Sequence, residues 1–371
     1  MLLEKLVDNN KPFVIFKKPQ SGKVYIWQQN NSGLYTSGDL SMNGYYFAPF
    51  DFNEHPVIVF PEKHSNIKEV MLHKLEPFGA KEYRFEFEIT GRDAEVYKKK
   101  VNQALSLINL KKLHKIVLSR FIKVEVEDFD IFDGLIKLMH TYDNAYVYLW
   151  HHPAAGTWMG ATPELLAGYK NGWLTTVSLA GTVTGFESEN TLDLVNGNLN
   201  KFSINKEDVP GSWGAKEFNE QQIVTDYIED ILKKYATHIE TGKPETIRQG
   251  HLEHIKTGFS AEIKPVDLNT VIRQLHPTPA VCGLPVEAAK YYIKQLEAYD
   301  RRFYTGFIGV KNHKTASLYV NLRCMEVREK FFLIYAGGGI VAGSRPEKEW
   351  QEILLKAEVI LSGLNNKKYT L

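Results

Sequence analysis

The apolar residues of this 371-residue chain follow two different spacings, which predict strands in some segments and helices in others. Alternate apolar positions are typical of half-buried strands, whereas spacings of three and four are typical of helices. The segments with strand character are 55–63, 81–90, 115–127, 145–152, 304–310, 317–327 and 330–339. The segments with helical spacing are 91–110, with Asp93 as the predicted N-cap, 131–142, 219–236 and the later part of 276–297.

The order of these segments predicts the fold class. Runs of strands are interrupted by helices without regular strand–helix alternation, which favours an α+β fold with large antiparallel sheets. We expect a β-rich N-terminal segment, residues 1–90, packed on a larger domain, residues 91–371, in one continuous structural unit. The segment that ends near Pro210 is predicted to be a polar loop with helix-forming character, and 241–259 gives no decisive pattern.

Composition and charge exclude several classes of protein. The 45 basic and 44 acidic residues nearly cancel, so the chain lacks the basic surface of a nucleic-acid binder. Cys282 and Cys324 lie in apolar surroundings without metal-ligand spacing, and we expect both to be core thiols. The first 19 residues place charges within their apolar stretch, so we do not expect them to be a signal peptide, and the least polar run, 331–343, is too short to span a bilayer. We expect a cytoplasmic protein.

The segment 335–358 contains the densest group of candidate functional residues. Three consecutive glycines allow backbone N–H groups to approach an anion closely, but no Gly-Lys-Ser/Thr follows, so this is not a nucleotide-binding P-loop. Ser344 and Glu347 have the spacing of a capping box at the start of a helix. Glu349, Glu352 and Lys356 then fall on one helical face. This stripe is either a functional site or a solvated charged surface with an ion pair.

Two further candidates have the chemistry of a general base and a general acid. Lys115 interrupts an apolar strand, "KIVLSR", where it either extends along the sheet edge toward water or enters a pocket that lowers its pKa. Glu164, in "MGATPELLAG", is either an ordinary turn residue or an acid whose pKa is raised by burial.

The remaining candidates are a possible metal ligand, a possible anion-binding residue and a histidine pair. Glu220 lies on the inward side of its predicted helix and is either a Mg²⁺ ligand or a favourable contact with the helix dipole. Arg323 lies within an apolar strand, "VNLRC", and requires a carboxylate from a substrate or from the protein itself. His251 and His254 have no third ligand nearby, and we interpret them as surface residues.

Taken in order along the chain, these motifs resemble those of the chorismate-utilising enzymes. The matching segments are "KIVLSR", "GATPELLAG", "LAGT", "NEQQIV", "HPTPAVCGLP", "RRFYTGFIG", "NLRCMEV" and "AGGGIVAGSRPEKEWQE", which cover roughly residues 90–365. The family includes isochorismate, salicylate, anthranilate and aminodeoxychorismate synthases. The resemblance implies a single α+β unit in which large antiparallel sheets, wrapped by helices as in anthranilate synthase component I, enclose a deep active site, with 91–371 as the chorismate-binding catalytic domain.

The resemblance also implies a cofactor and a set of substrate-binding residues. It implies Mg²⁺ held by Glu220 and Glu352, with Glu349 close by, on the ring carboxylate of chorismate. The positions expected to contact the substrate are Gly181, Thr182, Ala280, Tyr304, Arg323, Gly337, Gly338 and Lys356.

The position of the nucleophile distinguishes members of the family. Lys115 stands where water-using members carry a lysine and ammonia-using relatives usually carry glutamine. Ala180 stands where covalent aminodeoxychorismate synthases carry a lysine. Ala280 matches isochorismate synthases rather than the threonine of salicylate and anthranilate synthases, whereas Val281 departs from the bulkier leucine often found beside it. We therefore expect an isochorismate synthase, an isomerase.

The mechanism implied by the resemblance uses Lys115 as the base that activates water for attack at C2, and Glu164 as the acid that protonates the departing C4 hydroxyl. The alternatives are a salicylate synthase, an ammonia-using synthase component and a non-catalytic protein that retains the fold. We expect a monomer with no glutaminase partner. The sequence does not distinguish whether isochorismate would feed menaquinone, a siderophore or salicylate.

Overall fold

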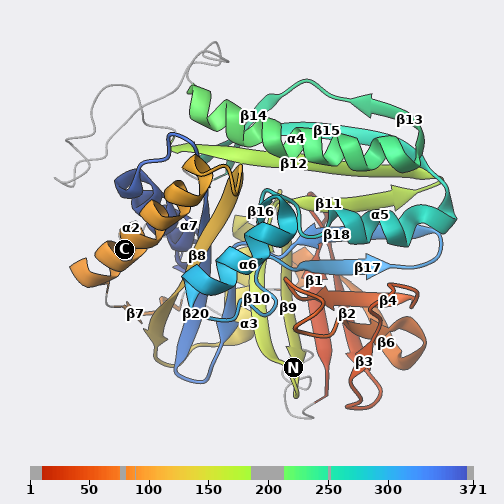
Figure 1. The fold of residues 1–371 in the computed structure, drawn as a ribbon. Coiled ribbons are helices and arrows are strands. Elements are labelled where there is room, and N and C mark those ends of the chain that lie inside the picture. The colour runs from red at the N-terminus through yellow and green to blue at the C-terminus, as the bar shows by residue number, and fades with distance from the viewer. Residues whose placement is uncertain (1–10, 76–80, 88, 185–212, 250–251, 366–371) are drawn as a thin grey trace, which may run out of the picture.

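Two large antiparallel sheets dominate the computed structural model, which describes residues 11–75, 81–87, 89–184, 213–249 and 252–365 (Figure 1). The first sheet has the order β16 (Gly283–Leu284), β8 (Lys115–Val126), β20 (Phe331–Val341), β19 (Cys324–Val327), β10 (Gly156–Thr162), β9 (Tyr146–His152), β1 (Phe13–Lys17), β2 (Lys23–Gln29) and β6 (Ser65–Met71), and β7 (Phe85–Glu86) also pairs with β8. The second has the order β13 (Ala236–Thr241), β15 (Leu252–Ile263), β12 (Trp173–Thr184), β11 (Leu165–Lys170), β18 (Thr315–Val320), β17 (Phe307–Lys311), β4 (Gly44–Ala48), β5 (Ile58–Pro61) and β3 (Tyr35–Thr36), and β14 (Glu245–Gln249) pairs with β15.

Six α-helices in the described ranges cover the outer faces of the sheets. They are α2 (Gly91–Asn109), α3 (Ile131–Thr141), α4 (Ala215–Tyr235), α5 (Leu268–Leu275), α6 (Val286–Glu297) and α7 (Pro346–Asn365). Helix α4 lies along β12 and β15, while α2 and α7 lie side by side near β8 and β20 (Figure 1). In the described ranges, no helix combines the length and apolar character needed to cross a membrane.

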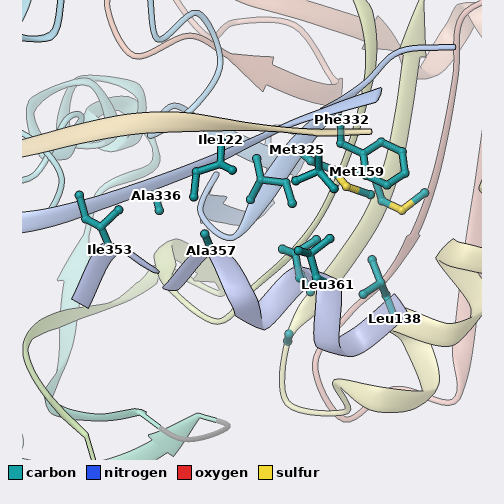
Figure 2. Packing of buried hydrophobic residues seen from close by; sticks show 14 of the residues in the cluster. Ile122, Leu138, Met159, Met325, Phe332, Ala336, Ile353, Ala357 and Leu361 are labelled. Carbon is teal, nitrogen blue, oxygen red and sulfur yellow. The ribbon is translucent and has the colours of Figure 1, made fainter. Parts of the chain in front are cut away.

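Helix α7 is attached to the first sheet by its apolar face. Ile353, Ala357 and Leu361 point toward the sheet, where they meet Ile122 of β8 and Ala336 of β20 (Figure 2). All five side chains are almost completely buried, so their removal from water supplies most of the force that docks the helix. This docking also determines where the polar residues of the same helix lie.

Aromatic rings fill the space between the two sheets. Phe47 of β4, in the second sheet, stacks on Trp150 of β9, in the first, with ring centroids 4.1 Å apart. Tyr335 of β20 stacks on Trp158 of β10 at 5.4 Å and on Tyr304 at 5.3 Å. Such offset pairs contribute beyond the area that they bury. Cys282 and Cys324 are buried free thiols, as predicted.

Several predicted boundaries are wrong in ways that matter for the site. The segment 317–327 is not one strand: β18 ends at Val320 in the second sheet, β19 begins at Cys324 in the first, and Arg323 lies between them with a φ of +46°. The indecisive segment 241–259 contains β14 and most of β15. The polar loop predicted up to Pro210 lies almost entirely outside the described residues.

Two predicted helix starts also differ from the structure. Thr90, not Asp93, is the N-cap of α2; its side chain accepts from the N–H of Asp93, whose carboxylate accepts from the N–H of Thr90. Helix α7 begins at Pro346, so the residue before its first position is Arg345 rather than the predicted Ser344, whose hydroxyl accepts from the N–H of Val341.

Candidate active site

A pocket lies where the chain crosses from one sheet to the other. One crossing, between β10 and β11, carries Glu164, and the second, between β18 and β19, carries Arg323. Two backbone hydrogen bonds join the crossings. The N–H of Val320 donates to the carbonyl of Glu164 at 2.9 Å, and the N–H of Ala161 donates to the carbonyl of Arg323 at 3.1 Å. Both functional side chains are thus placed by the same backbone junction.

The structure brings most of the predicted site residues to this pocket. Its wall includes Glu164, Gly181, Thr182, Glu220, Ala280, Tyr304, Arg323, Gly337 and Lys356. Lys115, Gly338, Glu349 and Glu352 are not among the residues of the wall. Lys115 pairs with Glu220 and Glu352 pairs with Lys356, both of which line it, whereas Glu349 pairs with Lys216 and faces Gly338. The sequence therefore located a single cluster, although its residues come from both sheets and two helices.

The predicted base, Lys115, is fully buried rather than extended toward water at a sheet edge. It is the first residue of β8, and its Nζ lies 3.0 Å from Oε1 of Glu220 in α4. Burial favours the neutral form of Glu220, but the nearby ammonium groups of Lys115 and Lys216 hold its pKa below the ordinary value. The pair is accommodated because Gly339 of β20, which lies beside it, has no side chain.

Gly339→Ala is expected to lower the free energy of unfolding by about 1–3 kcal/mol, the usual cost of overpacking. A Cβ at this position would lie 2.1 Å from Oε1 of Glu220 and 3.1 Å from Cε of Lys115, so the ion pair must move. Urea denaturation of the purified protein measures the change. Gly258→Ala is the control, because a Cβ at that strand position meets no atom within 4 Å. Equal stability of the two variants would contradict the close packing described here.

Each of the three predicted metal-binding carboxylates is paired with a lysine. In addition to the Lys115–Glu220 pair, Nζ of Lys216 lies 2.7 Å from Oε1 of Glu349, and Nζ of Lys356 lies 2.6 Å from Oε1 of Glu352. Burial and the neighbouring Glu352 raise the pKa of Glu349 to about 7, against the opposing effect of Lys216. Lys216 was not among the predicted site residues, although its position four residues before Glu220 places both on one face of α4.

The carboxylates suit a hard cation such as Mg²⁺. Among the described residues, no three histidine, cysteine, aspartate or glutamate side chains stand together in a metal-binding arrangement. Mg²⁺, however, is commonly held by only one or two carboxylates together with substrate oxygens and water. Oε2 of Glu349 is buried without a hydrogen-bond partner, and it faces Gly338, where a Cβ would lie 3.4 Å from it. The residues present therefore fit this ion.

Glu164 has the environment of a proton donor. Its side chain is buried, and burial raises its pKa to about 8 even though Lys115, Lys356 and Arg323 oppose the shift. A carboxyl group with this pKa is mostly protonated at neutral pH. The alternative interpretation as an ordinary turn residue does not account for this burial beside three cations.

His254 was predicted to be a surface residue, and this prediction is wrong. It is buried in the pocket wall, with Nε2 3.3 Å from a guanidinium nitrogen of Arg323 and Nδ1 3.2 Å from the hydroxyl of Thr182. Burial and then the positive charge of Arg323 lower the pKa of His254, so the ring is neutral. The neutral tautomer with a proton on Nδ1 donates to Gly181, 3.3 Å away, and accepts from Arg323 through Nε2. His251 lies outside the described residues.

A β-bulge brings His254 to this place. Strand β12 pairs with β15 so that Ala180 faces Ile255 and Thr182 faces His254, and Gly181 is the extra residue between them. Its φ of +70° is readily adopted only by glycine. The glycine of the "LAGT" motif thus permits the bulge in β12 that lies opposite His254.

Lys356 and Tyr304 complete the wall beside the glycines of β20. Nζ of Lys356 donates to the carbonyl of Gly337 at 3.1 Å. A Cβ on Gly337 would lie 2.9 Å from the hydroxyl of Tyr304, so only glycine lets that ring lie so close to the strand. The site therefore combines exposed backbone, an ammonium group and a guanidinium group around one cavity, which is suited to a small substrate with several negative charges.

Residues 59–365 match the family model described as chorismate binding enzyme. The chain belongs to the chorismate-binding enzyme family. Within this family, the isochorismate synthase MenF of Haemophilus influenzae is 30% identical over 266 residues, which are 71% of this chain and 59% of that protein. The chain thus spans less than two thirds of the length of this relative.

Solved structures of similar proteins confirm the predicted fold class. The structure of DhbC from Bacillus anthracis has a TM-score of 0.77 at 25% identity and covers 99% of this chain and 100% of its own. Anthranilate synthase component I from Streptococcus pneumoniae has a TM-score of 0.65 at 20% identity, with 94% and 90% covered. The second likeness shows the fold alone, and that fold is the predicted one.

Proposed function

We propose that the protein is an isochorismate synthase, an isomerase that converts chorismate to isochorismate with Mg²⁺ as cofactor. The observation that carries the proposal is a buried glutamate, Glu164, whose pKa is raised by burial, on the wall of a pocket of a chorismate-binding enzyme, together with a buried lysine, Lys115, that pairs with Glu220 of the same wall. The name of the Haemophilus relative and the alanine at position 280 support the same activity. In the proposed reaction, water adds at C2, the ring double bonds shift and the C4 hydroxyl leaves as water.

Lys115 acts as the general base in this proposal. It takes a proton from the attacking water, which requires a neutral amine and therefore requires its ion pair with Glu220 to open when the site is loaded. A positioned base of this kind contributes roughly 10²–10⁴-fold to a rate. No glutamine stands at this position to favour ammonia.

Glu164 acts as the general acid. Its raised pKa keeps a proton on the carboxyl group at neutral pH, and this proton is donated to the C4 hydroxyl as the C–O bond breaks. The charges of Lys115 and Glu164 change in opposite directions during the step, because Lys115 gains a proton and Glu164 loses one. The site as a whole therefore keeps its net charge.

The remaining polar groups hold the two substrate carboxylates. Arg323, oriented by His254, and Lys356 supply charged donors, and Tyr304 and the backbone beside Gly337 shape the surface on which the enolpyruvyl group lies. Glu220, Glu349 and Glu352 would hold Mg²⁺. The bound ion would orient the ring carboxylate and withdraw electron density through it.

The purified protein is expected to convert chorismate, in the presence of Mg²⁺ and the absence of ammonia, into a product of unchanged mass and altered retention. Liquid chromatography with mass detection resolves the product. EDTA is expected to stop the reaction, and an excess of Mg²⁺ should restore it. Titration calorimetry with Mg²⁺ alone provides a measurement that does not depend on turnover.

Other products would replace the proposal with a specific alternative. Salicylate and stoichiometric pyruvate would identify a salicylate synthase. A product that appears only with added ammonia would identify a synthase component that requires a glutaminase. Unchanged chorismate under all conditions would identify a protein that retains the fold without the activity.

A further inference from the structure

Arg301 is a buried guanidinium group that the proposed mechanism does not use. It lies in the connection between α6 and β17, and only 3% of its surface is exposed. It does not line the pocket itself. Its Nε and Nη2 donate to the two carboxylate oxygens of Glu297, at 2.8 and 2.5 Å, in the forked geometry that arginine favours.

The other contacts of Arg301 reach three separate walls of the pocket. Nη2 donates to the carbonyl of Val117 at 2.8 Å, and Nη1 donates to the carbonyl of Val281 at 2.9 Å and to the hydroxyl of Thr305 at 3.2 Å. All three acceptor residues line the pocket. Each also lies close in sequence to a residue of the site, because Val117 follows Lys115 by two positions, Val281 follows Ala280 and Thr305 follows Tyr304.

Glu297 holds the guanidinium group to β8 at a second point. Its Oε1 accepts from the backbone N–H of Ser119 at 2.6 Å and from the hydroxyl of Ser119 at 2.8 Å. Ser119 pairs in register with Gly337, one of the glycines that line the pocket. The buried ion pair is thus fully hydrogen-bonded, and it joins the end of α6 to the strand that carries the base.

We propose that Arg301 is a positioning residue that fixes the separation of three pocket walls, and thereby the position of the substrate between Lys115 and Glu164. Only a guanidinium group supplies donors in a planar fork wide enough to reach four acceptor residues at once. A lysine can keep the ion pair with Glu297, but its single ammonium nitrogen cannot hold Val117, Val281 and Thr305 together. The effect that we expect on the kinetics of chorismate conversion rests on the proposed function.

The test compares Arg301→Lys with Arg302→Lys in the 371-residue protein. Arg302 is a matched control because it also donates to a glutamate, Glu326 at 2.8 Å, and to a backbone carbonyl, that of Ala155 at 2.9 Å. Neither partner lines the pocket. Hydrogen–deuterium exchange with mass detection is measured first, because it does not depend on any activity.

Arg301→Lys is expected to speed amide exchange at 117–119, 281–283 and around 305, while Arg302→Lys leaves these segments unchanged. With chorismate and Mg²⁺, Arg301→Lys is expected to lower kcat/KM about 100-fold, with a rise in KM. A simple loss of folded protein would lower kcat while leaving KM unaltered.

Unchanged exchange at all three segments in Arg301→Lys would overturn the inference, and so would an unchanged KM in an active protein. If the wild-type protein leaves chorismate unaltered, the proposed function fails, and the exchange experiment alone decides whether Arg301 holds the walls. A different case is that wild-type and Arg302→Lys proteins are active and amide exchange changes only in Arg301→Lys. The values of KM and kcat/KM for chorismate then decide whether the position of the pocket walls affects the reaction.

Discussion

Replacing Lys115 by alanine is expected to lower kcat for chorismate conversion by about 10²–10⁴-fold, the contribution typical of a positioned general base. Two other lysines lie nearby, Lys216 paired with Glu349 and Lys356 paired with Glu352, and in the proposal both keep these pairs while the Lys115–Glu220 pair opens. KM should change much less, because the side chain lies behind the pocket wall. Initial rates of chorismate consumption at saturating Mg²⁺ measure the effect.

Lys17→Ala is the control for this experiment. Lys17 is as completely buried as Lys115 and also belongs to the first sheet, where it forms an ion pair with Asp143 at 3.2 Å. Its loss should lower the melting temperature without a specific loss of kcat per folded molecule. A Lys115→Ala protein that keeps wild-type kcat would show that another group activates the water.

Replacing Glu164 by glutamine is expected to lower kcat by a similar factor, about 10²–10⁴-fold, because the amide cannot donate the required proton. In the wild-type protein, activity should fall as pH rises through about 8, since the acid form of Glu164 is then lost. The residual activity of Glu164→Gln should lack this decline. A pH–rate profile of both proteins decides the matter, and an identical alkaline decline in the variant would assign it to a different group.

The same substitution should change how stability depends on pH. The folded-state pKa of Glu164, about 8, exceeds its ordinary value of 4.5, so the folded protein keeps a proton that the unfolded chain releases. The associated stabilisation is complete below pH 4.5 and is lost as pH rises through 8. Relative to wild type, Glu164→Gln should therefore gain stability across this interval, as melting temperatures at successive pH values would show.

The sequence predicted the fold class because local periodicity and motif order agree over most of the chain. Apolar spacing predicted many of the elements. Among them are the strands β8, β9 and β20 and the helices α2, α3 and α7. The stripe of Glu349, Glu352 and Lys356 was also recognised, since helical geometry alone places these residues on one face. Motifs that lie within one helix or strand could therefore be predicted from the sequence.

Features that depend on two elements distant in the sequence could not be predicted from the sequence. Arg323 was placed inside a strand because the apolar pattern continues through 317–327, yet the chain changes sheets there. His254 was misassigned because β15 is polar and irregular next to the bulge at Gly181, so its inward positions carry no clear alternation. The buried alternation that runs back from Ile263 to Thr257 continues to Ile255, not to His254, so it gave no signal for the histidine.

The ion pairs could not be predicted for a related reason. Lys115, Glu220 and Gly339 meet only after β8, α4 and β20 have packed, and nothing in the local sequence of any one of them specifies the other two. Arg301 gave even less warning, because its role depends on carbonyl groups whose direction is set by the fold. The sequence suggested which residues have the chemistry, whereas the packing determined which residues meet.

The pairing of β8 with β20 has a consequence for how the protein is made. This pairing joins β8, residues 115–126, to the last described strand, so a long loop must close before the two strands gain any stabilisation from each other. During synthesis, β20 and α7 leave the ribosome after every other described element. A nascent chain that already contains both Lys115 and Glu164 still lacks Gly337 and Lys356, and it therefore has no complete pocket in which to hold a substrate.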